Sequence, residues 1–207
     1  MFGRVLNVAN ELVRRHTLAT GVCTAAVKGA AAEATSQMIV GHPFEADRTI
    51  AFGLWNGAYC GGFAFWLYNV QFPARWPLVL ANGLAHPRAR LHTALMVGAD
   101  NFIFTPFFCL PSYYAFHSLV ESAHRGLDAG FVRRGLERYR DEFVPTVQLS
   151  LSLWIPIHTL TFSVVPTHLR VHWSACCSFL TLMCFSALQG KLERARPHAA
   201  HEGTSGE

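Results

Sequence analysis

Charged residues are scarce in this chain. Only 14% of its 207 residues are Asp, Glu, Lys or Arg, and 51% are hydrophobic. Soluble domains carry roughly 25% charged residues, which help to cover their water-facing surface. The shortage of charge argues against an ordinary soluble domain and favours a protein embedded in a lipid bilayer.

Basic patches and catalytic motifs are also missing. The formal charge of +4 is scattered along the chain, whereas a nucleic-acid-binding surface needs clustered Lys and Arg. The sequence contains no dinucleotide-binding glycine motif, no P-loop and no nucleophile elbow. We therefore expect a protein that is not an enzyme, needs no cofactor and binds no nucleic acid.

Two metal-site patterns are present but incomplete. Glu121 and His124 have the spacing of half a di-iron site, but the chain has no second Glu-x-x-His. His168 and His172 are four residues apart without a third ligand close in sequence. We expect no bound metal.

The central apolar stretch, Thr93–Ser122, contains Asp100 and Asn101. A helix of ~20 apolar residues crosses the bilayer core. An ionised Asp at that depth costs roughly 2.5–3.5 kcal/mol, so it should not face lipid. We expect Asp100 either to face a water-filled pore or cation site, or to pair with Lys28, Arg170 or a hydrogen-bond donor on a neighbouring helix.

Other stretches have similar apolar character. We expect further membrane spans at Thr17–Val40, Arg48–Phe72 and Pro166–Leu192. Val147–Phe162 would add a fifth span if it crosses independently. The predicted fold is an all-α polytopic membrane bundle of four or five spans. It forms one transmembrane domain over residues 1–192, followed by a polar tail, 193–207.

The segments between the spans are more polar. We expect a turn at Gly41–Asp47, with Asp47 as a helix N-cap. The proline-containing segment Pro73–His92 is interpreted as a loop. Ala123–Glu142, which alternates basic and acidic residues, is interpreted as a solvated or amphipathic surface helix.

The N-terminal segment, Met1–His16, has the basic, amphipathic character of a mitochondrial presequence. It carries Arg4, Arg14 and Arg15 against the single acid Glu11. We expect an uncleaved amphipathic helix that lies on the membrane surface.

Small residues repeat every four positions in the first two spans. This small-xxx-small pattern lets helix backbones approach closely, and it predicts helix packing through Gly21, Ala25, Gly29, Gly53, Gly57 and Gly61. The first span also carries the polar residues Lys28, Glu33 and Gln37; the last two share one helix face.

Spaced motifs run through the chain. The first span has Glu33 and Gln37. The second begins Asp47-Arg48-Thr49 and continues through Gly61, Gly62, Phe65, Trp66 and Leu67. The third has Asp100, Asn101 and Pro106. In this order and spacing, the chain resembles the small membrane-protein family named after Mpv-seventeen and the twenty-two-kilodalton peroxisomal membrane protein.

The C-terminal part carries the most specific part of this resemblance. The family pattern there is W-P-x-x-Q-x-x-N-F-x-x-V-P-x-x-x-R, and the residues that match it in register are Trp154, Phe162, Val165, Pro166 and Arg170. Pro156 is displaced by one position, His158 replaces the Gln and Thr161 replaces the Asn. We expect Trp66, Pro106, Trp154, Phe162 and Pro166 to have structural roles.

The resemblance implies a four-span, all-helical protein of mitochondrial inner or peroxisomal membranes, without established enzymatic activity. Some members of the family behave as weakly selective pores. In this chain, several of the family's intramembrane amides are replaced, which weakens the expectation of a pore lined by them.

Two functional hypotheses follow. The favoured one is a structural accessory subunit, packed in lipid against other membrane proteins such as a large respiratory-type complex, in the mitochondrial inner membrane. The alternative is a weakly selective pore for ions or small solutes; a peroxisomal location is the alternative for the organelle. The candidates for a pore lining or a buried polar network are Lys28, Glu33, Gln37, Asp100, Asn101, His158 and Arg170.

Overall fold

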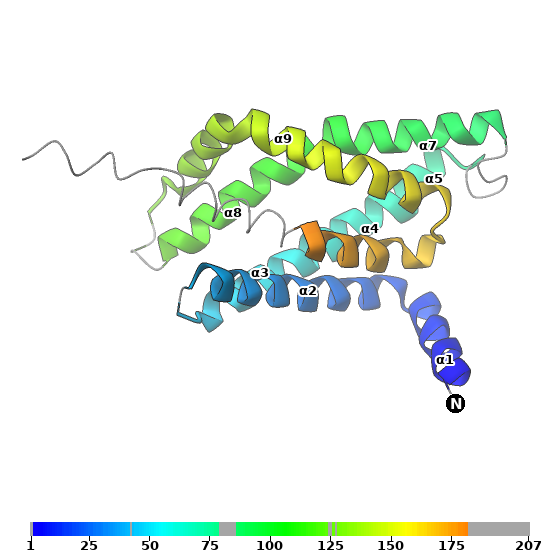
Figure 1. Ribbon diagram of the computed structural model, residues 1–207, viewed down its shortest axis with the longest axis horizontal. Coiled ribbons are helices and arrows are strands. Elements are labelled where there is room, and N and C mark those ends of the chain that lie inside the picture. Colours follow the sequence, from blue (N-terminus) through cyan, green and yellow to red (C-terminus); the bar gives the residue numbers. More distant parts are fainter. Residues whose placement is uncertain (1, 42, 79–85, 124–125, 127, 182–207) are drawn as a thin grey trace, which may run out of the picture.

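The computed structural model describes residues 2–41, 43–78, 86–123, 126 and 128–181. Within these residues every regular element is a helix, as predicted, and there is no strand (Figure 1). The predicted tail, 193–207, and the end of the predicted last span lie outside the described residues.

The first two helices have nearly the bounds that the sequence predicts. Helix α1 is Phe2–Arg15 and α2 is Thr17–Val40. Helix α2 ends because Gly41 adopts the left-handed conformation with φ 81°, which glycine reaches without steric cost. Helix α1 lies at one end of the bundle at an angle to α2 (Figure 1).

A continuous helical rod follows, from Ala46 to Arg75. It begins with α3 (Ala46–Asn56) and continues through η1 (Gly57–Phe63), α4 (Ala64–Trp66), η2 (Leu67–Gln71) and α5 (Phe72–Arg75), where the η segments are π-helical. The prediction that Asp47 caps this helix is wrong. Glu45 is the N-cap residue. Its backbone N–H donates to the Gln37 side chain at 2.8 Å, which ties the start of α3 to α2.

A second continuous helical rod runs from Pro87 to Ala123. It consists of α7 (Pro87–Ala99), the π-helical η4 (Asp100–Cys109) and α8 (Leu110–Ala123). The interpretation of Pro73–His92 as a loop is therefore wrong at both ends. Pro87 occupies the first position of α7, where no backbone N–H is needed. The ring of the N-cap residue His86 accepts the N–H of Arg88 at 3.2 Å.

Helix α9 is Phe131–Ser163, and it joins the predicted polar segment to the apolar segment after it. Val147–Phe162 is thus not a helix of its own. Pro145 and Pro156 lie inside α9 without ending it, and both are exposed. A 3-10 turn, η5 (Thr167–Leu169), and a helix over residues 170–181 complete the described chain. Pro166 therefore precedes the turn, rather than beginning the helix.

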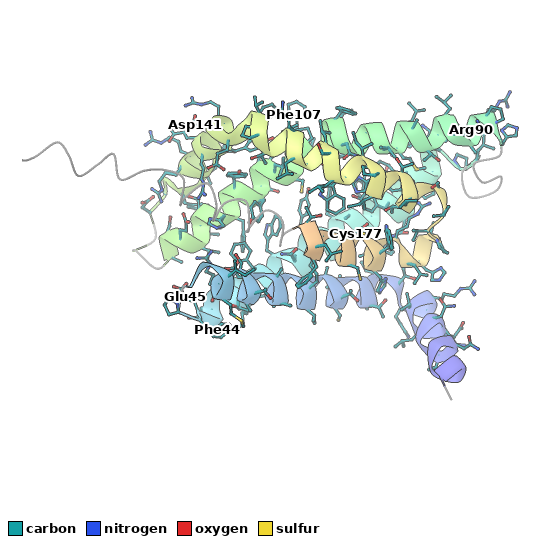
Figure 2. All side chains as sticks on the ribbon, in the orientation of Figure 1. Phe44, Glu45, Arg90, Phe107, Asp141 and Cys177 are labelled. Atoms are coloured by element: carbon teal, nitrogen blue, oxygen red, sulfur yellow. The ribbon has the colours of Figure 1, made fainter. Side chains whose placement is uncertain are left out.

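Two of these rods are long and apolar enough to cross a membrane, by length and composition: Pro87–Ala123 with 37 residues and Phe131–Ser163 with 33. Large apolar side chains cover the outside of the first of them. Phe102, Ile103, Phe107 and Phe108 are each more than half exposed, and Phe107 lies on the outer face in Figure 2. Exposed apolar surface of this extent is typical of contact with lipid or another protein.

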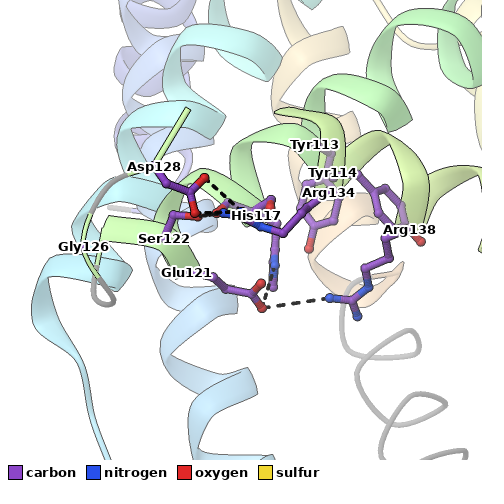
Figure 3. Close-up of a pocket in the computed structure, with 11 residues that line it drawn as sticks. Tyr113, Tyr114, His117, Glu121, Ser122, Gly126, Asp128, Arg134 and Arg138 are labelled. Atoms are coloured by element: carbon purple, nitrogen blue, oxygen red, sulfur yellow. Dashed lines mark hydrogen bonds and ion pairs between the residues drawn. The ribbon is translucent and has the colours of Figure 1, made fainter. Parts of the chain in front are cut away.

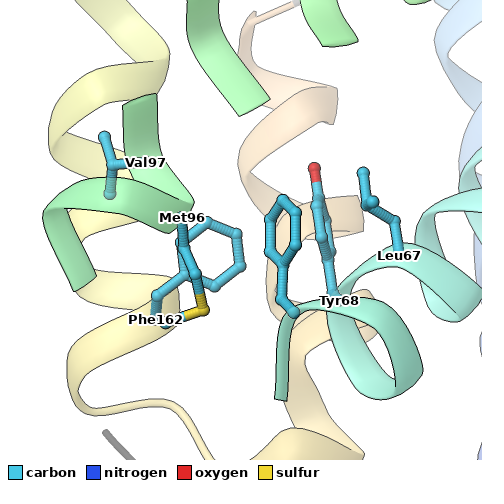
Figure 4. Packing of buried hydrophobic residues seen from close by; sticks show 6 residues of the cluster. Leu67, Tyr68, Met96, Val97 and Phe162 are labelled. Carbon is cyan, nitrogen blue, oxygen red and sulfur yellow. The ribbon is translucent and has the colours of Figure 1, made fainter. Parts of the chain in front are cut away.

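The hydrophobic core forms where three of the rods meet. Its buried members are Leu67, Tyr68, Phe72, Met96, Val97 and Phe162 (Figure 4). The Phe162 ring packs edge-on against the rings of Tyr68 and Phe72, with centroids 5.2 and 5.4 Å apart. This aromatic contact holds α9 against the rod that contains η2.

Helix α2 packs closely against α3 and η1 through small residues. A Cβ atom on Gly61 would lie 2.4 Å from the Val22 Cα atom, and one on Gly57 would lie 3.1 Å from the Ala26 Cβ atom. On α2, Ala25 is fully buried and a Cβ atom on Gly29 would meet Asn56 at 2.5 Å. The other glycines of the small-xxx-small pattern are also at close contacts: Gly53 approaches Ala26 and Ala30, and Gly21 approaches Val171.

Candidate functional site

The carboxylate of Asp100 lies in the interior of the bundle, at the junction of α7 and η4. The Tyr68 hydroxyl donates a hydrogen bond to Oδ1 at 3.0 Å, and the His158 Nδ1 atom lies 2.9 Å from Oδ2. The predicted pairing with Lys28 or Arg170 is therefore wrong, and the alternative expectation of a hydrogen-bond donor on a neighbouring helix is confirmed by Tyr68. The partners come instead from η2 and α9, which face Asp100 from two sides.

Asn101 completes this cluster. Its side-chain nitrogen donates to the Val97 carbonyl at 2.9 Å and lies 3.0 Å from the His158 Nδ1 atom. The Tyr68 hydroxyl also lies 3.4 Å from the Nε2 atom of the same ring. Because both carboxylate oxygens of Asp100 have protein partners, the cluster satisfies the buried carboxylate without requiring a bound cation.

Arg170 occupies a separate buried position. Its Nη1 atom donates to the Tyr68 carbonyl at 3.0 Å and its Nε atom to the Val165 carbonyl at 3.4 Å, while the guanidinium lies 5.5 Å from the centre of the Phe162 ring. Among the described residues no carboxylate lies within ion-pair distance of it. Arg170 therefore ties the last helix to η2 through backbone carbonyls and an aromatic face.

Lys28 and Glu33 have different partners. The Lys28 Nζ atom donates to the Asn56 Oδ1 atom at 2.7 Å. The Glu33 Oε1 atom lies 2.5 Å from the Arg48 Nε atom and accepts from the Gln37 side chain at 3.2 Å. Both contacts join α2 to α3, so the polar residues of the first span fasten the two helices together.

The predicted polar residues line neither of two pockets in the described part of the chain. Lys28, Glu33, Gln37, Asp100, Asn101, His158 and Arg170 are all buried. An apolar groove of about 360 Å³ between α7 and α9 and a polar pocket of about 390 Å³ between α8 and α9 are both lined by other residues. The arrangement is a set of closed contacts between helices.

The residues with expected structural roles differ in their environment. Phe162 is fully buried, whereas Trp66 is 45% exposed on the surface. The Trp154 ring lies 4.8 Å from the His158 ring, centre to centre. The Pro106 carbonyl accepts a hydrogen bond from the Tyr139 hydroxyl at 2.7 Å. Trp154 and Phe162 thus pack against the His158 ring of the Asp100 cluster.

Several partners were missed from the sequence. Tyr68, Asn56 and Arg48 were not considered as partners of buried charges. The spacing offers a signal for Asn56, because it lies between Gly53 and Gly57 on the face that packs against α2. No comparable signal identifies Tyr68.

The incomplete metal patterns do not come together in the described part of the chain. His168 Nε2 lies 3.1 Å from the Asn10 Oδ1 atom, in a contact between η5 and α1. Glu121 contacts His117 and Arg138, and His124 lies outside the described residues. No group of three His, Cys, Asp or Glu side chains among those described is placed to hold a metal ion.

Comparison with known proteins agrees with the C-terminal motif. Residues 130–186 match the Mpv17 / PMP22 family. This segment contains α9, the η5 turn and Arg170, and it confirms the resemblance predicted from the sequence. No curated protein and no solved structure matches the chain.

Proposed function

We propose that this chain, whose residues 130–186 match the Mpv17 / PMP22 family, is a non-enzymatic accessory subunit of a larger membrane assembly. Members of the family are organelle membrane proteins. The mitochondrial inner membrane is the favoured location because of the presequence-like composition of α1, and the peroxisomal membrane is the alternative.

One observation carries this proposal: the Asp100 carboxylate is enclosed by Tyr68 and His158. A pore or transport pathway exposes its ionisable residues to water. Here the carboxylate is 3% exposed and is satisfied by neighbouring helices. Buried polar contacts of this kind fix the way helices pack, which is the task of a structural subunit.

The outer surface supports the same proposal. Apolar side chains that are exposed on η4 continue on other helices, where Val27 on α2 and Leu54 on α3 are about 70% exposed. Lipid covers part of such a surface, and apolar faces of other membrane proteins cover the rest. In this arrangement the amphipathic helix α1 lies on the membrane surface.

The proposed topology has four spans, namely α2, the rod Ala46–Arg75, the rod Pro87–Ala123 and the last helix. The alternative topology has five spans, the fifth being the apolar half of α9, and the whole helix Phe131–Ser163 is long and apolar enough to cross a membrane. Four spans place both termini on one side of the membrane and five place them on opposite sides. Protease protection of tags on the two termini distinguishes these topologies.

Gentle solubilisation tests the accessory role. Membranes from cells that express the tagged chain are dissolved in a mild detergent, and the extract is separated by native electrophoresis. The proposal expects the chain to migrate with larger proteins, and organelle markers in the same fractions identify the membrane. Migration as a lone monomer, under conditions that preserve known assemblies of the same membrane, contradicts the accessory role.

A pore remains the second candidate, because the resemblance to the family implies pore-like members. If the chain conducts, purified protein in vesicles gives ion or solute flux, and Asp100→Leu changes or abolishes it. Asp141→Leu is the matched control, because Asp141 is an exposed acid on the polar half of α9. Flux that is the same in wild type and in folded Asp100→Leu excludes Asp100 as a pore residue.

A further inference from the structure

A polar pocket of about 390 Å³ lies between α8 and α9 (Figure 3). Its volume is in the range of small-molecule sites, roughly 300–1,000 Å³. Tyr114, His117 and Glu121 line it from α8, and Arg134 and Arg138 line it from α9. The pocket uses none of the predicted buried polar residues.

The two helices form a fixed wall for the pocket. A Cβ atom on Gly135 would lie 2.6 Å from the Tyr114 carbonyl oxygen, so the backbones of α8 and α9 are in direct contact there. The Tyr114 hydroxyl also donates to the Glu142 carboxylate at 2.7 Å. Helix packing thus fixes the backbone positions from which the charged side chains extend.

Each charged group of the pocket is held by neighbours but keeps free hydrogen-bonding capacity. Arg134 contacts the Asp128 carboxylate at 2.8 Å and the Ser122 hydroxyl at 2.6 Å. The hydrogen bond from Arg134 holds the pKa of the Asp128 carboxyl below its usual value, so this acid is charged at neutral pH.

The contacts around Glu121 are looser. The Arg138 Nη1 atom lies 3.9 Å from the Glu121 carboxylate, beyond hydrogen-bond distance, and the His117 Nδ1 atom lies 3.3 Å from it. The Glu121 side chain is 42% exposed. Arg138 is held mainly by its Nε atom, which donates to the Glu142 carboxylate at 3.2 Å. The Glu121 carboxylate and the remaining guanidinium N–H groups of Arg138 therefore face the pocket with capacity for a further partner.

Charges of both signs line the pocket. Among the described residues, two guanidinium groups, of Arg134 and Arg138, face two carboxylates, of Glu121 and Asp128. A simple anion would bind the guanidinium groups but would be repelled by the carboxylates, and a simple cation would meet the reverse situation. A ligand that carries both charges satisfies both sets at once.

We propose that this pocket binds a zwitterionic headgroup in which a phosphate and a primary amine are linked, as in phosphoethanolamine. The phosphate accepts hydrogen bonds from Arg134 and Arg138, since guanidinium groups match phosphate oxygens in geometry. The amine donates to Glu121. Because the pocket lies at the polar ends of two membrane-like rods, the proposal rests on the membrane location given above, where phospholipid headgroups surround these ends.

The test uses the full-length protein purified in detergent and measures binding by calorimetry. The probes are glycerophosphoethanolamine, which is the headgroup without acyl chains, inorganic phosphate and ethanolamine. The zwitterion is expected to bind at least tenfold more tightly than either single-charge probe. Arg138→Gln and Glu121→Gln are each expected to weaken its binding about tenfold or more, the loss of one charge-assisted hydrogen bond.

Arg133→Gln and Glu137→Gln are matched controls, because this exposed pair lies on α9 outside the pocket. They are expected to leave binding unchanged. The proposal is overturned if phosphate binds as tightly as the zwitterion, if Glu121→Gln has no effect in a protein with wild-type circular dichroism, or if the control variants weaken binding equally.

A second measurement identifies the source of the headgroup. Native mass spectrometry of the protein in nanodiscs that contain phosphatidylethanolamine and phosphatidylglycerol reports which lipid stays bound. Retention of phosphatidylethanolamine that Arg138→Gln abolishes supports a lipid ligand, and binding of the soluble headgroup without lipid retention supports a free metabolite of the same chemistry. Both measurements use isolated protein, so their failure is distinct from a failure to co-migrate with larger proteins.

Discussion

The His158 ring and the Asp100 carboxylate lie 2.9 Å apart, joining α9 to η4 with side chains only 3% and 5% exposed. The resemblance implies a Gln at the position of His158. A Gln amide also donates a hydrogen bond to a carboxylate, so the histidine keeps the hydrogen-bonding function of the amide toward Asp100. The contact explains why an acid is tolerated in the most apolar rod of the chain.

Substitution of His158 tests this contact. His158→Leu leaves one oxygen of a buried carboxylate without its donor, and we expect it to lower the free energy of unfolding by about 2–4 kcal/mol. His158→Gln keeps a donor and should lower it by less than about 1.5 kcal/mol. Unfolding by denaturant in micelles measures both. Equal losses for the two variants would show that ring packing, rather than the hydrogen bond, stabilises this site.

Close packing of α2 on η1 predicts a strong position dependence for Gly→Ala substitutions. Gly61→Ala places a Cβ atom 2.4 Å from the Val22 Cα atom, so the backbones must separate at a cost of about 1–3 kcal/mol. Gly98→Ala is the control, because no atom lies within 4 Å of its added Cβ. Alanine's higher helix propensity should make that variant more stable by about 0.5–1 kcal/mol. Thermal unfolding in detergent compares them, and similar losses at both positions would contradict the packing.

The Lys28–Asn56 contact predicts an asymmetric response. Asn56→Ala leaves the buried ammonium without its acceptor and is expected to lower the free energy of unfolding by about 1–3 kcal/mol. Lys28→Met removes the charge while keeping most of the volume, and we expect a change within about 1 kcal/mol or a gain in stability. Denaturant unfolding of the two variants and the double variant measures this. A larger loss for Lys28→Met than for Asn56→Ala would indicate a role for the ammonium beyond this contact.

The sequence predicted which residues are buried better than it predicted their partners. Helix α2 has the predicted bounds because an apolar run and Gly41 define its end. The high cost of exposing charge to lipid correctly pointed to burial of Lys28, Glu33 and Asp100. The partners depend on how the helices face each other. The small-residue pattern predicted that Gly61 lies at a helix contact, but no local pattern identifies Val22 as the residue that it meets.

The proline-containing segments were the least predictable. A helix was expected to end near Pro73, yet it continues to Arg75, and α9 continues through Pro145. Pro145 is exposed, so the carbonyl that lacks its usual donor is on an open face of α9. The polar pocket was missed for a different reason: Arg134 and Arg138 lie in a segment of mixed charge, whose pattern resembles that of a solvated helix.

Pro106 and Pro111 explain the role of the Tyr139 hydroxyl. In a π-helical turn the N–H of residue 111 would donate to the Pro106 carbonyl, as the Leu110 N–H does to the Thr105 carbonyl. Proline at 111 has no N–H, and the Tyr139 hydroxyl donates to the Pro106 carbonyl at 2.7 Å. We infer that Tyr139 replaces the missing backbone donor.

A double-mutant cycle tests this replacement. Tyr139→Phe leaves the buried carbonyl without a donor and should lower the free energy of unfolding by about 1–3 kcal/mol. Pro111→Ala restores a backbone N–H, so Tyr139→Phe in that background should lower it by about 1 kcal/mol less than in the wild-type chain. Denaturant unfolding of the four proteins gives the coupling energy. If the effect of Tyr139→Phe is the same in both backgrounds, the hydroxyl stabilises the fold independently of the proline, and the contact between α9 and η4 has another origin.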